Sequence, residues 1–121
     1  MQIQVNADQS IHGHDAMATW VHGVVEEALV RVEDYITRVE VHVSDENGQK
    51  QGLNDKRCTM EARLEGFHPI AVTHHAATVN LAVKGAAAKL FRLVTSTLER
   101  QRLRRPRRSA PSSAEYVIMT P

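Results

Sequence analysis

The sequence has 121 residues and a mass of 13.5 kDa, which suits one compact domain and leaves little room for two. It is 42% hydrophobic and 24% charged, so the chain can bury a core. A single cysteine excludes an intramolecular disulfide framework and a cysteine-rich zinc site. No apolar run approaches the length of about 20 residues that spans a bilayer, and the amino terminus shows no charged-then-apolar signal pattern. We therefore expect a cytoplasmic protein without a membrane segment.

The charges of the chain are unevenly distributed. Residues 1–83 hold six Lys and Arg against twelve Asp and Glu, whereas residues 84–108 hold nine Lys and Arg against Glu99 alone. The formal net charge of +1 therefore hides an anionic first part and a strongly cationic second part. Such asymmetry favours a polyanionic partner more than the overall pI of 8.0 does.

The first half of the chain predicts a strand, a helix and a second strand. Residues 2–5 alternate apolar and polar side chains, as in a strand with one buried face. Over residues 14–34 apolar side chains recur at every third or fourth position, which predicts a helix, and its polar residues are mostly acidic. Residues 38–44 show the clearest alternation, with valines at every second position, and the polar residues 45–55 predict a loop.

The second half predicts two more strands and a long helix. The alternation of residues 57–64 places Cys58 on the apolar face, a turn is expected at 66–69, and a strand follows at 70–73. A helix is predicted over residues 75–102, because Pro106 prevents its clean continuation. One face of this helix is apolar and is formed by Val79, Val83, Ala86, Ala87, Leu90, Val94 and Leu98.

The expected fold class is α+β, in the order β-α-β-β-β-α. A four-stranded sheet with one apolar face needs a cover, which two amphipathic helices supply, so we expect a two-layer sandwich. The first two strands are joined through a helix and should be parallel with a right-handed crossover, while hairpins make the other pairs antiparallel. We expect the domain to span residues 1–104 and residues 105–121, which are rich in Arg and then in Ser and Pro, to form a flexible tail.

The basic second helix is the strongest functional signal. Arginines present planar, permanently charged groups that match phosphate oxygens, and helical spacing places several of them along one ridge. A few cations at a helix end would be explained by the helix dipole, but nine cations with one acid in this segment are not. The strands carry no aromatic residues typical of RNA base stacking, so we expect binding through phosphates and shape.

Catalysis and metal binding have little support in the sequence. The histidine pairs His12/His14 and His74/His75 lack the helical spacing and the carboxylate partner of a metal site. Cys58 is expected to be a packed thiol, and the acidic pairs at 26–27 and 45–46 have no apolar pocket that would shift their pKa. We expect no enzyme activity, no cofactor, no metal and no small-molecule substrate.

Three segments resemble the family of ribosome hibernation promoting factor and ribosome-associated inhibitor A, also known as the sigma-54 modulation family. They are residues 36–48, 55–64 and 69–77, and the likeness to single-domain members covers roughly residues 1–104. The resemblance implies a protein of stationary phase or stress that binds the small (30S) ribosomal subunit and its 16S rRNA. Members of the family occupy the channel of messenger and transfer RNA and so block translation while preserving idle ribosomes.

The resemblance also implies where ribosomal RNA binds. The family's Lys-Leu-x-Arg pattern in the second helix is kept as Lys89-Leu90-Phe91-Arg92, and we expect Lys89, Arg92 and Arg100 to be exposed. The first helix is often basic in the family, but here it has one cation, Arg31, among acids. The candidate rRNA-binding residues are Lys84, Lys89, Arg92, Arg100, Arg102 and Arg104, with Arg31, His74 and His75 as additional candidate phosphate contacts.

The sequence is also compatible with two other functions. One is a protein-interaction regulator of the sigma-factor modulation type, which would use the polar sheet face or the tail. The other is nonspecific RNA binding, which would give equal affinity for ribosomes and for arbitrary duplex RNA.

Overall fold

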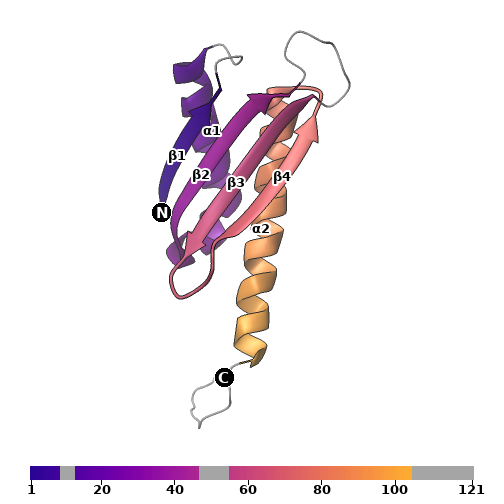
Figure 1. The fold of residues 1–121 in the computed structure, drawn as a ribbon. Helices are drawn as coiled ribbons and strands as arrows, with labels where there is room; N and C mark the ends of the chain where they lie inside the picture. Colours follow the sequence, from indigo (N-terminus) through magenta and orange to yellow (C-terminus); the bar gives the residue numbers. More distant parts are fainter. Residues whose placement is uncertain (9–12, 47–54, 105–121) are drawn as a thin grey trace.

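The computed structural model describes residues 1–8, 13–46 and 55–104, and these form a single four-stranded sheet covered by helices (Figure 1). The predicted order β-α-β-β-β-α is confirmed, with a short 3₁₀ helix, η1, inserted after the first helix. The elements are β1 (Gln2–Ala7), α1 (His14–Leu29), η1 (Val30–Tyr35), β2 (Ile36–Asp45), β3 (Lys56–Leu64), β4 (Ile70–Ala76) and α2 (Val79–Arg104).

The sheet has the mixed topology that the sequence predicts. Its strand order is β1-β2-β3-β4, with β1 and β2 parallel and the other two pairs antiparallel. Figure 1 shows both helices behind the same face of this sheet, and it shows α2 continuing well beyond the turn between β3 and β4. The last turns of α2 therefore project from the two-layer body.

The core lies between the sheet and the helices. The register places Val39 opposite Ala62, Val41 opposite Met60 and Val43 opposite Cys58, and all of these side chains are buried. The buried face of α2 comes from Val83, Ala86, Ala87, Leu90 and Val94, as predicted, while Val79 and Leu98 are only partly buried. The aromatic residues Trp20, Phe67 and Phe91 pack at the margin of this core.

The first helix is shorter than the sequence predicts. The α-helical hydrogen bonding ends at Leu29, and the tighter turns of η1 replace the predicted helical stretch up to residue 34. Leu29 leaves the α-helical region, with φ −108° and ψ 10°, and Val32 is still buried against the core. The 3₁₀ turns thus reverse the chain within a few residues, so that Ile36 begins β2.

The boundary between β4 and α2 also differs from the prediction. β4 continues to Ala76, because Ala76 pairs with Lys56 and His75 pairs with Arg57 across the sheet. Thr78 caps the start of α2, because its hydroxyl accepts the Leu81 N–H at 3.1 Å. A side-chain cap of this kind satisfies a backbone donor that the first helical turn leaves free. The pair His74 and His75 is therefore part of β4 and not of a strand–helix junction.

Cys58 is a packed thiol. The side chain is completely buried in β3, as its inward position predicts. Burial raises the pKa of the Cys58 thiol to about 12, since the thiolate would lose its hydration. At neutral pH the group is therefore protonated and unreactive.

Within residues 1–8, 13–46 and 55–104, no helix is both long enough and apolar enough to cross a membrane.

Candidate nucleic-acid interface

The cations of α2 form one exposed face, which we call the α2 cationic face and define as Lys84, Lys89, Arg92 and Arg100. Lys84, Arg92 and Arg100 are exposed, whereas Leu90 and Val94 on the opposite side of the helix are buried. From residue 84 to residue 100 the helix rises about 24 Å at 1.5 Å per residue. The face is thus a rigid array of positive charge whose geometry is set by the packing of α2 on the sheet.

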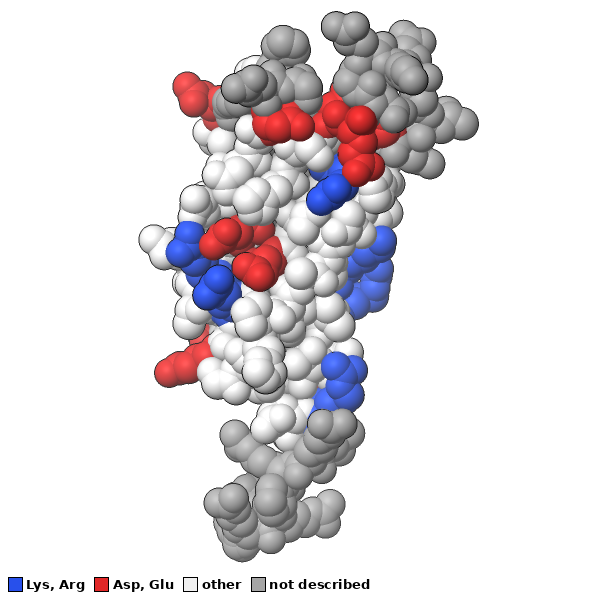
Figure 2. All heavy atoms as spheres, viewed as in Figure 1, with Lys and Arg blue, Asp and Glu red and all other residues white. Residues whose placement is uncertain are grey.

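Among the described residues, no carboxylate forms an ion pair with a cation of this face. The ion pairs in residues 1–8, 13–46 and 55–104 lie on the sheet, on α1 and at the ends of β2, β3 and β4, and none includes a cation of α2. The Arg100 guanidinium makes long hydrogen bonds to the hydroxyls of Ser96 (3.5 Å) and Thr97 (3.4 Å). In Figure 2 blue side chains without neighbouring red ones follow the edge of the molecule where α2 runs.

The Lys89 side chain is less exposed than the sequence predicts. Its side chain is half-buried, and its ammonium group donates a hydrogen bond of 3.0 Å to the backbone carbonyl oxygen of Thr73 in β4. This bond satisfies an acceptor on an edge strand of the sheet. The expectation that Lys89 is exposed was wrong, because the side chain is half-buried, and a substitution there would change the packing of α2 on β4 as well as the charge.

Arg102 and Arg104 continue the helix beyond Arg100. Both belong to α2, which ends at Arg104, but their side chains lie outside the described parts of the structure. The remaining arginines of the basic run, at 105, 107 and 108, also lie outside the described residues. The predicted division of the chain at residue 104 stays a prediction.

His74 faces α2 and is closely packed against it. Its imidazole ring lies over Gly85, so near that a Cβ atom at position 85 would overlap the ring. Burial, the positive charge of Lys89 and the neighbouring His75 lower the pKa of His74 below its ordinary value of 6.5. At neutral pH the ring is therefore uncharged, and any phosphate contact would use it as a neutral hydrogen-bond donor.

This environment predicts that acid destabilises the protein through His74. The pKa of His74 is lower in the folded than in the unfolded state, so the unfolded state takes up more protons below about pH 6.5 and stability falls as the pH drops. Urea unfolding at pH 7 and pH 5 measures the loss, which should be smaller in His74→Ala than in the natural protein. His68→Ala, which removes an exposed histidine, is the control. An equal loss in all three proteins would contradict the assignment.

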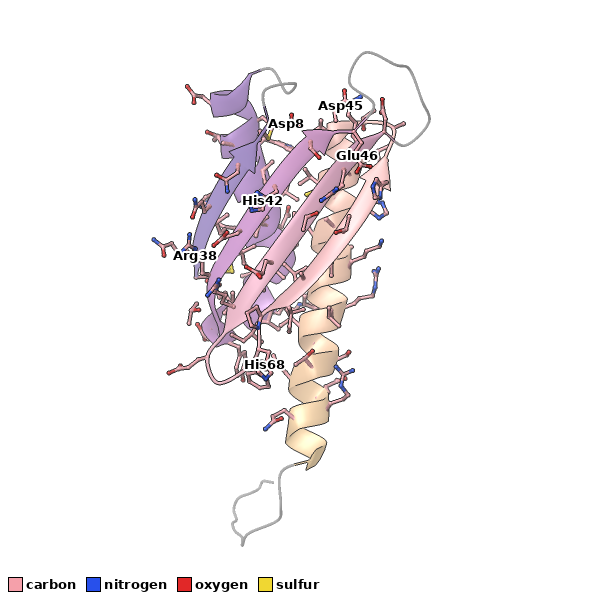
Figure 3. The ribbon with its side chains drawn as sticks, in the orientation of Figure 1. Asp8, Arg38, His42, Asp45, Glu46 and His68 are labelled. Atoms are coloured by element: carbon pink, nitrogen blue, oxygen red, sulfur yellow. The ribbon has the colours of Figure 1, made fainter. Side chains whose placement is uncertain are left out.

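His75 points to the opposite, outer face of the sheet, where it already has a partner. Its Nε2 atom lies 2.9 Å from Glu46 Oε1, and Glu46 Oε2 lies 3.0 Å from Arg57 Nη1. The Arg57 hydrogen bond is the main cause that holds the pKa of Glu46 below 4.5, and His75 adds to it. Glu46, labelled in Figure 3, thus lies between two basic groups at one end of the sheet.

This arrangement of residues 45–46 was not predicted, because their adjacent acids had been interpreted only as a candidate acid/base pair. Lys56 lies between Asp45 (3.2 Å) and the buried Asp55 (3.0 Å), and the Glu46 N–H donates to the Asp55 carbonyl. These bonds join the ends of β2 and β3 where the chain enters and leaves segment 47–54. The sequence did contain a signal for it, namely the alternation of apolar and polar residues in β2 and β3. Once these two strands are paired through their apolar faces, Asp45 lies opposite Lys56.

The rest of the outer sheet face also has its charges paired. Arg38 and Arg63 are directly opposite, as are Glu40 and Glu61, so like charges meet across β2 and β3. Pairs along each strand relieve this repulsion: Arg38 lies 3.1 Å from Glu40, and Arg63 lies 3.8 Å from Glu61. Arg38 also donates to the side-chain oxygen of Gln4 on β1. This face therefore offers less free charge than α2 does.

Arg31 lies on η1, apart from the α2 cationic face in the chain, and its side chain is exposed. The acids Glu33 and Asp34 follow it, so the local charge is negative. The exposed part of α1 includes Asp15, Glu26 and Glu27. Among the described residues, the cations without an ion pair thus lie mainly on α2, while α1 and η1 carry an excess of acids.

A metal-binding arrangement is not present in the part of the chain that the structure describes: nowhere there do three or more His, Cys, Asp or Glu side chains converge. The functional inference therefore depends on the α2 cationic face.

Comparison with known proteins identifies the family. The family model described as "Sigma 54 modulation protein / S30EA ribosomal protein" matches residues 9–102, which is most of the chain. The chain belongs to this family. The match confirms the resemblance seen in residues 36–48, 55–64 and 69–77.

Solved structures share the fold. The N-terminal domain of Protein Y from Thermus thermophilus superposes with a TM-score of 0.58 at 21% sequence identity, covering 80% of this chain and 99% of that domain. A ribosomal subunit interface protein from Coxiella burnetii gives a TM-score of 0.60 at 15% identity, covering 82% of this chain and 99% of its own. A search of curated protein sequences gives no match.

Proposed function

We propose that this protein binds the small (30S) ribosomal subunit and blocks the channel of messenger and transfer RNA, as a hibernation factor of the cytoplasm. Membership of a family of ribosome-associated proteins supports a ribosomal partner. The single observation that carries the site is the α2 cationic face, whose charges have no carboxylate partner in the described residues. In this proposal, 16S rRNA supplies the anions that pair with these cations.

The chemistry of binding follows from the rigidity of α2. The helix is fixed by Val83, Leu90 and Val94, which are buried against the sheet, so Arg92 projects its guanidinium without a large cost in backbone entropy. Guanidinium groups make short, charge-assisted hydrogen bonds to phosphate oxygens. Each such contact releases condensed counterions from the RNA, so that affinity depends steeply on salt.

The anionic surface of α1 and η1 gives the bound protein its orientation. RNA repels Glu26, Glu27 and Glu33 while it attracts α2, so the protein approaches the ribosome with α2 first. We propose that this polarity replaces the second basic helix that relatives often have. The exposed candidate Arg31 then contributes at most a peripheral phosphate contact.

Inhibition requires no catalysis in this proposal. A folded domain that occupies the path of messenger and transfer RNA excludes both by its volume, and dissociation restores the ribosome. No cofactor and no small-molecule substrate takes part. The outer sheet face, with its internal ion pairs, is a poorer candidate than α2 for the main contact of a sigma-factor type regulator.

Sucrose-gradient fractionation of a stationary-phase lysate at low salt tests the proposal. We expect the protein in the fractions of the 30S subunit and of whole ribosomes, and not with free 50S subunits. An excess of arbitrary duplex RNA should leave this distribution unchanged, since shape as well as charge selects the site. Protein found only at the top of the gradient, or displaced by the duplex, would contradict specific binding to the small subunit.

A further inference from the structure

An apolar groove lies beside the end of α2, away from the two-layer core. It has a volume of about 440 Å³ and is bordered by η1, by the turn between β3 and β4, and by the last turns of α2. Its apolar walls include Tyr35, Phe67 and Leu98, and the Tyr35 side chain is 57% exposed. An exposed tyrosine next to two partly buried apolar side chains forms a surface that gains free energy when it is covered.

The polar groups of the groove suit a peptide. Thr95 also lines the groove, although its hydroxyl oxygen is buried and has no hydrogen-bond partner among the described residues. Glu65 and Glu99 also line the groove, and neither has an ion pair in the described ranges. The groove therefore combines apolar walls with negative charge, which suits a peptide that carries apolar and basic residues.

The segment that follows α2 has the complementary composition. Residues 105–108 contain three arginines, and residues 116–119 read Tyr-Val-Ile-Met, the main apolar run of segment 105–121. We propose that residues 116–119 dock into the groove of Tyr35, Phe67 and Leu98 within the same molecule, with the arginines of 105–108 near Glu65 and Glu99. This inference is independent of ribosome binding.

The distances allow this docking. Leu98 lies about 9 Å along the helix axis before Arg104, where α2 ends, at a rise of 1.5 Å per residue. The 12 residues from 105 to 116 span up to about 40 Å when extended, and a flexible chain of that length has an average span of about 19 Å. The linker therefore reaches back to the groove without full extension. Because both partners belong to one chain, their effective concentration is in the millimolar range, and a weak contact suffices.

Paramagnetic broadening in the full chain tests the proposal. A nitroxide placed through Thr120→Cys should broaden the NMR signals of Val32, Phe67 and Leu98 at least about twofold, and leave those of α1 unchanged. The buried Cys58 thiol does not compete for the label, and the natural protein treated with the same reagent provides the reference. In Val117→Asp/Ile118→Asp the broadening should disappear. In the matched variant Ser112→Asp/Ser113→Asp, with the same added charge in the same segment, it should persist.

A groove-side variant and a mixed sample complete the test. Tyr35→Glu, at an exposed position that the core does not need, should also remove the broadening. In the mixed sample, one protein carries the NMR isotopes and no nitroxide, and the other carries the nitroxide and no isotopes. No broadening should appear in this sample. Broadening in that mixture, at the level seen within one molecule, would show that the groove accepts the tail of a second copy and would overturn the proposal. So would the absence of broadening in the full chain, or its persistence in Val117→Asp/Ile118→Asp.

Discussion

Reversing three charges of α2 is expected to abolish the binding of this protein to the small ribosomal subunit. In Lys84→Glu/Arg92→Glu/Arg100→Glu the Kd should rise at least about 100-fold, because each charge-assisted contact contributes about 1 kcal/mol or more and the new carboxylates repel phosphate. All three side chains are exposed, so the fold should be kept. Binding of labelled protein to purified 30S subunits measures the change.

Two controls separate charge at this site from charge in general. Lys89 is left unchanged, because its bond to the Thr73 carbonyl links α2 to β4. Arg63→Glu gives the same charge change as Arg92→Glu, also at an exposed arginine, but on the outer face of the sheet. We expect a Kd increase of about tenfold for Arg92→Glu and less than about threefold for Arg63→Glu. Equal effects of the two substitutions would contradict the placement of the site on α2.

Gly85→Ala is expected to destabilise the protein although alanine favours helices. The His74 ring occupies the space that a Cβ at position 85 would need, so either the ring or α2 must move. Overpacking of this kind costs about 1–3 kcal/mol, which exceeds the gain of about 1 kcal/mol in helix propensity. Urea unfolding at pH 7 should therefore show a net loss of up to about 2 kcal/mol in the free energy of unfolding.

Gly23 provides the matched control for this prediction. It also lies within a helix, but a Cβ there meets no atom within 4 Å. Gly23→Ala should therefore raise the free energy of unfolding by about 1 kcal/mol. In the background of His74→Ala, the Gly85→Ala change should lose its cost, because the ring is gone. A stabilising effect of Gly85→Ala in the presence of His74 would show that the ring moves aside freely.

The sequence predicts the fold well wherever periodicity is strong. The alternation of Val39, Val41 and Val43 identifies the buried face of β2, and the spacing of Val83, Leu90 and Val94 identifies that of α2. These features are local, because period two and period 3.6 are properties of the backbone itself.

The boundaries of the elements were harder to predict. The end of α1 at Leu29 follows from how the chain must turn to enter β2, and no glycine or proline marks the site. The start of α2 was placed too early because the pairing of His75 with Arg57 depends on the register of β3. The cap at Thr78 becomes identifiable only once the length of β4 is known.

The environment of individual site residues depends on contacts between distant segments. Helical spacing groups Lys84, Arg92 and Arg100 correctly, yet it gives no sign that Lys89 reaches the Thr73 carbonyl. Helical spacing also does not explain why position 85 is a glycine. The explanation is that the His74 ring occupies the space of a Cβ atom there. Such information comes from the packing of β4 against α2 and is absent from either segment alone.

The salt dependence of binding tests the central claim most directly. We would measure Kd for purified 30S subunits between about 50 and 200 mM salt, for the natural protein and for Arg92→Glu. If Arg92 contacts a phosphate, the slope of log Kd against log salt should be shallower by about one unit or slightly less in the variant. Arg63→Glu should keep the natural slope. An unchanged slope in Arg92→Glu would show that this part of α2 does not bind the RNA backbone.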